Sequence, residues 1–180
     1  MNAYDGASNG KIMIHVCSLA ALPATVKAVR ASHVLTVMAN VDQVRRPESV
    51  LPANHLKVQM DDITEQLDGF VAPSESHIEQ VLNFVRGWDR NAPLVVHCYA
   101  GISRSTASAF AAVCALNPHR DEIAIARRIR AASPIAQPNR LIVSLADKAL
   151  GRDGRMLRAL DEMGPGSMTV EGRPFRIDLE

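Results

Sequence analysis

The chain has 180 residues, of which 47% are hydrophobic, and this length and composition suit one compact domain with a sizeable core. The net charge of +1 gives no reason to expect nucleic acid or a membrane as partner, and no apolar run is long enough to span a bilayer. Three cysteines (Cys17, Cys98 and Cys114) lack CxxC spacing, and the histidines form no ligand pattern, so we expect no disulfide framework, metal or other cofactor. The first residues do not resemble a secretory signal, which favours a cytoplasmic protein.

The first half of the chain alternates predicted strands and helices. Residues 1–10 are polar and are expected to be poorly ordered. Two nearly continuous apolar runs and one alternating run predict strands over 12–16, 33–38 and 56–60. A helix is expected from Ser18 to about Ala31, whereas 41–53 shows no periodicity and is expected to be a loop or short helix.

The second half is mainly helical apart from one strand. Ser74 is placed to cap a helix whose apolar residues recur at helical spacing: Ile78, Val81, Leu82, Val85 and Trp88. The apolar run 94–96 predicts the central strand. Further helices are expected over 103–116, from Asn117-Pro118 to about Ala132, from Pro138-Asn139 to Gly151, and within 156–163, whereas 168–180 shows no firm pattern. This order predicts an α/β three-layer sandwich with a central, mainly parallel sheet flanked by helices.

The most informative stretch, residues 97–105, reads HCYAGISRS. The preceding strand delivers the thiol of Cys98 to the start of a helix, whose free backbone N–H groups form a seat for an anion. If a phosphate is bound there, Arg104 can hold two of its oxygens while Cys98 lies beneath the phosphorus as a nucleophile. Gly101 permits a backbone turn that a Cβ would hinder. These residues favour covalent catalysis on a phosphate monoester.

The pattern His97-Cys98-x5-Arg104-Ser105 resembles the phosphate-binding loop of the cysteine-dependent protein tyrosine phosphatases. With Gly101 and Ser103 between, it is similar to the dual-specificity branch, whose usual form is HCxxGxSRS. The resemblance covers about residues 11–150, which we expect to be the catalytic domain. Residues 151–180 are then a C-terminal extension packed on, or trailing, the same domain.

The resemblance implies a role for each residue of the loop. Cys98 attacks as a thiolate and forms a phosphocysteine, and Arg104 holds the equatorial oxygens of the phosphate. Ser105 stabilises the departing thiolate, although an ordinary helix-start serine is the alternative, and His97 orders the loop by hydrogen bonding. The backbone N–H groups expected to complete the cradle belong to Tyr99, Ala100, Gly101, Ile102, Ser103 and Arg104.

The general acid must be a carboxyl across the phosphate from Cys98. The family places this acid at the end of a strand, and where two aspartates adjoin the second can act, so we expect Asp62, with Asp61 and then Asp68 as alternatives. Asp62 lies a few positions farther from Cys98 than is usual in the family, which extra residues in the following loop can absorb. A solvated turn residue is the alternative role for either adjacent aspartate.

Two further side-chain assignments stay open. Asn139 resembles an asparagine that in relatives holds the phosphate loop or nearby backbone, and helix capping is the alternative. Cys17 and Cys114 are expected to be core thiols, with a reversible disulfide to Cys98 as a minor hypothesis.

The loop also constrains the substrate. It lacks the lysines that branches acting on inositol lipids tend to carry, which favours a single phosphate on tyrosine or another small monoester. We therefore expect a metal-independent protein tyrosine or dual-specificity phosphatase, with a phosphorylated protein or small phosphomonoester as partner and an oligomeric state that the sequence does not indicate. The alternatives are a phosphatase of a nucleotide, sugar or inositol phosphate, an arsenate reductase, and a phosphate-binding module without catalysis.

Overall fold

The structure is a computed structural model that describes residues 13–179, so the predictions for 1–10 and for the first position of the strand over 12–16 lie outside the described residues. The described strands are Met13–Cys17 (β1), His33–Met38 (β2), His55–Gln59 (β3), Leu94–His97 (β4) and Phe175–Asp178 (β5). The described α-helices are Leu22–Val29 (α1), Glu75–Gly87 (α2), Arg104–Leu116 (α3), Glu122–Ala132 (α4), Arg140–Ala149 (α5) and Arg155–Met163 (α6). Short 3-10 turns form at Val41–Gln43 and Pro52–Asn54. Within residues 13–179, no helix combines the length and the hydropathy that a membrane-spanning segment needs.

The five strands form one sheet in the order β3-β2-β4-β1-β5. The first four strands in this order are parallel, and β5 is antiparallel to β1. The central strands β4, β1 and β2 are buried along their whole length because helices cover both faces, which explains their nearly continuous apolar sequences. In register, His97 at the end of β4 lies between Cys17 of β1 and Thr36 of β2. The carboxyl ends of the parallel strands therefore meet at one edge of the sheet.

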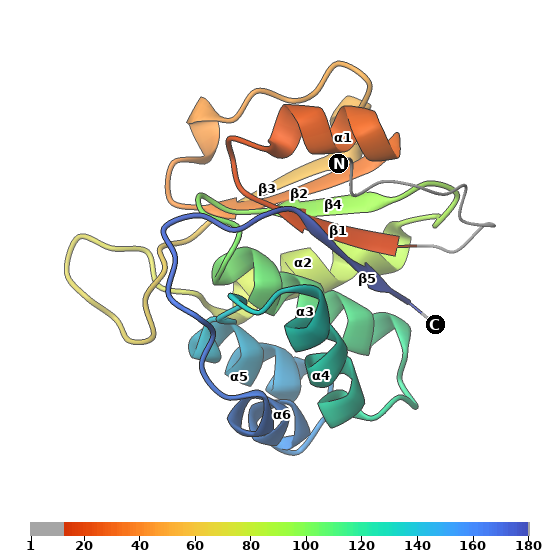
Figure 1. Cartoon of the computed structure of the whole chain (residues 1–180). Coiled ribbons are helices and arrows are strands. Elements are labelled where there is room, and N and C mark those ends of the chain that lie inside the picture. The colour runs from red at the N-terminus through yellow and green to blue at the C-terminus, as the bar shows by residue number, and fades with distance from the viewer. Residues whose placement is uncertain (1–12, 180) are drawn as a thin grey trace.

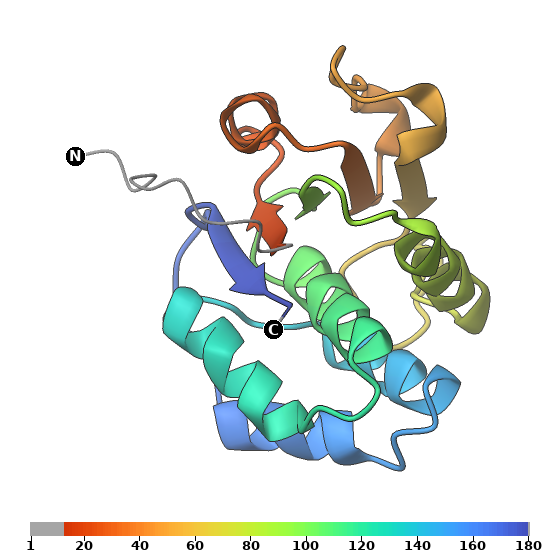
Figure 2. The same cartoon turned by 90° about the vertical axis from the view of Figure 1, so that its right-hand side faces the viewer.

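The helices cover the two faces of the sheet unequally. Helix α1 lies on one face and α2 to α6 lie on the other, as Figure 1 shows, and the view from the side in Figure 2 separates the same layers. The larger core is formed between the sheet and α2 to α6, and a smaller core lies under α1. This arrangement confirms the predicted three-layer sandwich around a mainly parallel sheet.

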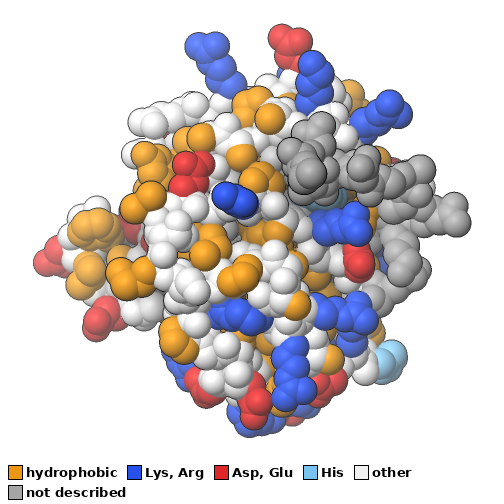
Figure 3. All heavy atoms as spheres, in the orientation of Figure 1, with side chains coloured by type: hydrophobic (Ala, Val, Ile, Leu, Met, Phe, Trp, Pro, Cys, Tyr) orange, Lys and Arg blue, Asp and Glu red, His pale blue; other side chains and the backbone are white. Residues whose placement is uncertain are grey.

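A loop at residues 61–73 projects from the carboxyl edge of the sheet on the left of Figure 1. Its base is closed by two contacts between Asp61 and Val71, in which each backbone N–H donates to an oxygen of the other residue over 2.7 Å. The loop exposes Leu67, Phe70 and Val71 beside several carboxylates, and its surface shows hydrophobic and acidic side chains in Figure 3.

Two predicted boundaries were wrong for local reasons. Helix α1 begins at Leu22 and not near Ser18, because the Ser18 hydroxyl accepts a hydrogen bond from the Ala21 N–H within a turn. Helix α4 begins at Glu122 and not at Asn117-Pro118. Asn117 instead ends α3, and the carboxylate of Asp121 caps α4 by accepting the Ala124 N–H over 2.7 Å.

The helices after 138 fit the predictions closely, whereas the last strand was missed. Asn139 caps α5 through the Ile142 N–H, and Gly151 follows the end of that helix with a φ of +62°. Residues 155–163 form α6. The strand β5 has only four residues, two of them charged, so it has too few alternating positions to stand out from a sequence pattern.

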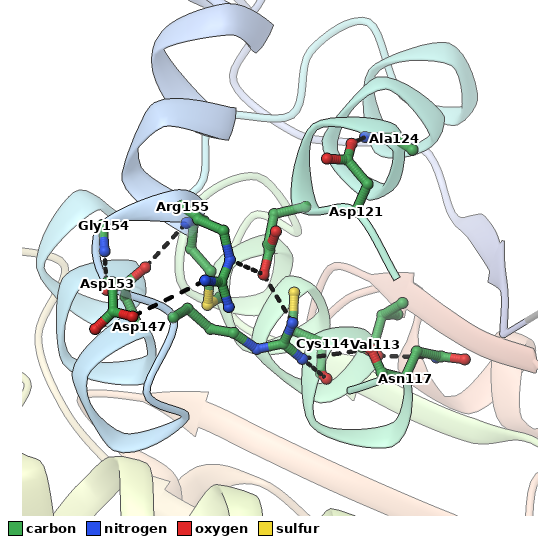
Figure 4. Close-up of polar contacts among 12 residues, drawn as sticks. Val113, Cys114, Asn117, Asp121, Ala124, Asp147, Asp153, Gly154 and Arg155 are labelled. Atoms are coloured by element: carbon green, nitrogen blue, oxygen red, sulfur yellow. Dashed lines mark hydrogen bonds and ion pairs between the residues drawn. The ribbon is translucent and has the colours of Figure 1, made fainter. Parts of the chain in front are cut away.

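A buried ionic cluster joins four helices. The Glu122 carboxylate accepts hydrogen bonds from Arg152 Nη1 (2.7 Å) and Arg155 Nε (3.1 Å), and Arg152 Nη2 donates to the Cys114 carbonyl (2.6 Å). The Asp147 carboxylate accepts the N–H groups at the start of α6 (Figure 4). These contacts connect the ends of α3 and α5 to the starts of α4 and α6.

This cluster leads to a stability prediction. Glu122→Gln should lower the free energy of unfolding by about 3–5 kcal/mol, because it leaves the buried Arg152 without its counter-charge. Urea denaturation followed by circular dichroism measures the change. The matched control is Glu162→Gln, which breaks an exposed pair with Arg127 and should leave stability nearly unchanged. Equal losses in the two variants would contradict the prediction.

Three histidines lie in strands where they are shielded from water. Burial lowers the pKa of His15 in β1, His55 in β3 and His97 in β4 to about 4 in each case. These side chains are therefore neutral in the folded protein at neutral pH. In the unfolded chain the same histidines bind protons near pH 6.5.

The difference predicts a loss of stability in mild acid. Between pH 6.5 and about 4 the unfolded chain binds more protons than the folded chain, so the free energy of unfolding falls as pH falls through this window. His15 and His97 should each contribute about 1 kcal/mol of this loss by pH 5.5. Urea titrations at pH 7 and 5.5 measure it. His15→Gln should reduce the pH dependence and the exposed His119→Gln should not; an unfolding free energy that is flat over this range would refute the assignment.

Candidate active site

The loop between β4 and α3 holds the sulfur of Cys98 at the start of a helix. Cys98 directly follows the last residue of β4, and the residue is only 2% exposed. A short loop, residues 99–103, separates it from the start of α3. Its sulfur lies 3.3 Å from the Gly101 N–H nitrogen and 3.1 Å from Ser105 Oγ. A backbone N–H, a hydroxyl and the positive end of a helix all stabilise a negatively charged sulfur.

The loop bends tightly over the end of β1. Gly101 has a φ of +73°, and a Cβ placed there would lie 2.7 Å from the carbonyl carbon of Cys17 and 2.8 Å from the nitrogen of Ser18. Both the conformation and the close approach require glycine. The Gly101 of the sequence motif therefore marks a contact between the loop and the strand beside it.

The carbonyl groups of the loop are occupied by neighbouring segments. Leu19 N–H donates to the Tyr99 carbonyl (3.0 Å), Gly172 N–H to that of Ala100 (2.8 Å), and Gln137 N–H to that of Ile102 (2.9 Å). By contrast, several N–H groups of the loop donate to no acceptor among residues 13–179: those of Tyr99, Ala100, Ile102, Ser103 and Arg104. The loop thus offers a set of backbone donors of the kind that binds an anion.

Arg104 directs its guanidinium toward the same site. Its Nη1 donates to the Met60 carbonyl at the end of β3 (2.9 Å), which fixes the side chain. Its Nε is buried without a hydrogen-bond partner and lies 3.9 Å from Asp62 Oδ2. A buried guanidinium N–H without an acceptor is unusual in a folded protein, and an oxyanion would satisfy it.

Asp62 lies over the loop, whereas the two alternative acids lie elsewhere. Asp62 Oδ1 accepts hydrogen bonds from Ser103 Oγ (2.7 Å) and Asn139 Nδ2 (2.8 Å). Asp61 turns away and closes the base of the 61–73 loop through the Val71 N–H. Asp68 is exposed in the outer part of that loop and forms no hydrogen bond or ion pair with a described residue.

Asn139 caps α5 and also contacts the segment that contains Asp62. Its Oδ1 caps α5 by accepting the Ile142 N–H (3.1 Å), while its Nδ2 donates to Asp62 and to the Ile63 carbonyl (3.2 Å). Its own N–H points to the Ser103 carbonyl over 3.4 Å. The side chain and the backbone N–H of this one residue therefore connect Asp62, the 61–73 loop and the 97–105 loop at the start of α5.

His97 is buried behind the loop in a chain of polar groups. Its Nε2 lies 2.7 Å from Thr36 Oγ1 and its Nδ1 lies 3.3 Å from the Cys98 carbonyl. Thr36 Oγ1 also lies 2.8 Å from His55 Nε2. These contacts are satisfied if His97 is neutral, with Nδ1–H donating to the Cys98 carbonyl and Nε2 accepting the Thr36 hydroxyl. The Nε2–H of His55 then donates to Thr36 Oγ1. Thr36 and His55 were missed, although a threonine inside a buried apolar strand is a detectable signal.

The C-terminal segment before β5 also contacts the loop and was missed. Ser18 Oγ donates to Glu171 Oε1 over 2.6 Å, and the next residue, Gly172, binds the Ala100 carbonyl. No local pattern in the sequence could reveal these contacts, because the partners are far apart in the chain.

The other two cysteines are buried thiols, and burial raises the pKa of Cys17 and of Cys114 to about 12.

Comparisons with known proteins agree with this site and this fold. A family model described as protein-tyrosine phosphatase matches residues 65–133, which include the 97–105 loop. The Cydia pomonella PTP-2 phosphatase has a similar structure, with a TM-score of 0.60 and 17% identity over 79% of this chain and 88% of that one. DUSP15 has a TM-score of 0.60 and 18% identity over 89% of this chain and 97% of that one. Human DUSP28 has a TM-score of 0.58 and 18% identity over 77% of this chain and 88% of that one.

A search among curated proteins found no significant match. The family-model match spans Cys98, Arg104 and helix α3, and the solved structures share the fold of this chain. The chain accordingly has the fold of dual-specificity phosphatases, and the protein-tyrosine phosphatase model matches the part of it that contains Cys98 and Arg104.

Proposed function

We propose that this protein hydrolyses phosphate monoesters, with phosphotyrosine as its preferred substrate, through a phosphocysteine intermediate and without a metal. The observation that carries the proposal is the convergence at one helix start of the Cys98 sulfur, the free N–H groups of the loop, and the buried, unpartnered Nε of Arg104. A thiolate nucleophile and a set of fixed positive donors are the two things that phosphoryl transfer to cysteine requires.

The first chemical step transfers the phosphoryl group to the enzyme. The phosphate oxygens bind the loop N–H groups and Arg104, which places the phosphorus above Cys98. The thiolate forms a bond to phosphorus as the ester bond to the leaving oxygen breaks, and Asp62 gives its proton to that oxygen. The contacts of Asp62 with Ser103 and Asn139 support this role, because they hold the carboxyl at the mouth of the loop.

The second step releases phosphate. Water attacks the phosphorus while the Asp62 carboxylate accepts the proton of the water, and the sulfur–phosphorus bond breaks. The sulfur leaves as a thiolate that the Ser105 hydroxyl and the Gly101 N–H stabilise by hydrogen bonding. The complete set of nucleophile, anion donors and carboxyl exceeds what phosphate binding alone requires, which favours catalysis over a binding module.

The surroundings of the site favour an aromatic phosphate ester. Leu67, Phe70 and Val71 are 45%, 49% and 40% exposed on the loop that follows Asp62, and Tyr99 beside the nucleophile is 68% exposed. Exposed apolar groups on the loop that carries Asp62 and next to Cys98 suit the ring of phosphotyrosine better than a small hydrophilic ester. The phosphate loop itself contains no lysine that would match a second phosphate.

The thiol mechanism predicts the behaviour of two cysteine variants. The wild-type protein should hydrolyse para-nitrophenyl phosphate in the presence of EDTA and be inhibited by vanadate, whereas Cys98→Ser should show no activity above background because a hydroxyl is a far weaker nucleophile here. Cys114→Ala, which changes a buried thiol of α3 away from the sulfur site, is the control and should remain active. Release of para-nitrophenol measures both, and an active Cys98→Ser protein would exclude the mechanism.

The acid assignment predicts a different response from three aspartate variants. Asp62→Asn should lower kcat for phenyl phosphate by about 10²–10⁴-fold, because its poor leaving group needs a proton, and should affect an activated aryl ester less. Asp61→Asn and Asp68→Asn are matched controls that should keep most of the kcat for phenyl phosphate. Release of phosphate measures kcat for all three variants. If either control loses this activity while Asp62→Asn keeps it, the acid is misassigned.

A further inference from the structure

A second hollow lies directly beside the phosphate loop and has no part in the chemistry above. It has a volume of about 290 Å³, and three segments distant in sequence form it: the turn after β1, the phosphate loop, and the C-terminal segment before β5. Its lining residues are Leu19, Ala20, Tyr99, Ala100, Val170 and Glu171. Tyr99 lines this hollow and follows the nucleophile Cys98 in the chain. When a substrate protein binds with its phosphotyrosine in the phosphate loop, a neighbouring residue of the substrate can therefore reach the hollow.

Backbone contacts hold the three walls in place. The turn after β1 is attached through Leu19 N–H to the Tyr99 carbonyl, and the C-terminal segment through Gly172 N–H to the Ala100 carbonyl. A Cβ on Gly172 would lie 3.0 Å from the Gly101 carbonyl oxygen and 2.9 Å from Ile135 Cδ1, so this segment is pressed against the loop. The hollow is therefore already formed in the protein without a ligand, which lowers the cost of binding into it.

The walls combine apolar surface with one negative charge. Leu19, Val170 and the exposed ring of Tyr99 provide the apolar part. Glu171 is the only acidic side chain among the lining residues, and its Oε1 is held by the buried hydroxyl of Ser18 over 2.6 Å. Within the described residues, Glu171 forms no ion pair with a basic side chain.

The charge of the Glu171 carboxylate opposes the binding of a phosphate in the neighbouring loop unless a cation lies beside it. The neighbouring loop is built to hold a phosphate dianion, and a negative charge close to that seat repels it. A lysine or arginine of the substrate would reverse this penalty. Its aliphatic stem would lie along Leu19 and Val170, and its charge would lie between the carboxylate of Glu171 and the ring of Tyr99.

We propose that this hollow is a specificity subsite for a lysine or arginine within two positions of the phosphotyrosine in a substrate protein. The inference rests on the proposed function, and it adds the sequence context that the enzyme selects. Glu171 is the residue that distinguishes basic from acidic neighbours, and Ser18 positions its carboxylate.

The test compares phosphotyrosine peptides that differ at one flanking position. Peptides with lysine, norleucine or glutamate at each of the two positions on either side of phosphotyrosine are assayed for kcat/KM by phosphate release. At one of these positions lysine should exceed norleucine by about three- to tenfold, the range of a partly exposed ion pair with a cation–π contact, and glutamate should be lowest. The lysine preference should weaken as salt is added.

Substitution of Glu171 decides whether this residue causes the preference. Glu171→Gln keeps an oxygen for Ser18 but removes the charge, so the ratio of kcat/KM between lysine and glutamate peptides should fall toward one. Glu48→Gln, which removes an exposed carboxylate from another part of the surface, should keep the wild-type ratio. A ratio that persists in Glu171→Gln overturns the assignment.

The outcomes separate the subsite from the function. If the wild-type protein hydrolyses para-nitrophenyl phosphate in a Cys98-dependent reaction but treats all peptides alike, the subsite is wrong and the phosphatase function stands. If no Cys98-dependent hydrolysis of any phosphate ester occurs, the proposed function fails and the subsite fails with it.

Discussion

The contact between Gly101 and the end of β1 is the constraint on which the site depends. Only a residue without a Cβ can lie this close to the backbone of Cys17 and Ser18 while adopting a φ of +73°. Because the loop is folded back at this point, the Gly101 N–H reaches the Cys98 sulfur. The parallel pairing of β1 and β4 places Cys17 beside His97, so the end of β1 lies next to the start of the 97–105 loop. The position of this loop therefore depends on the pairing of the strands.

The groups around the loop are arranged so that one residue serves several neighbours. Asn139 caps α5, holds Asp62 and binds the backbone of the loop that follows it. Arg104 is fixed to the end of β3 by one nitrogen and leaves Nε for the site. These shared contacts reduce the freedom of the charged side chains before any substrate binds, which is the physical basis of electrostatic preorganisation.

The C-terminal residues also contact the sheet and the 97–105 loop. β5 pairs with β1, α6 is attached to α3, α4 and α5 through the buried cluster around Glu122, and Gly172 binds the phosphate loop. The segment before β5 therefore lies against the 97–105 loop, and α6 and β5 hold its two ends in place. That anchoring gives the hollow beside Tyr99 a defined shape.

By itself, the sequence determined the class of fold and most of the helices and strands, and it singled out residues 97–105 as the candidate site. Apolar periodicity and the spacing of Cys98, Gly101 and Arg104 are local, and local patterns survive in a single sequence. Only the tertiary structure decided that Asp62 meets Asn139, 77 positions away, and that Ser18 meets Glu171, 153 positions away. Such pairs leave no periodic trace, because what brings them together is the order of strands in the sheet and the packing of helices on it.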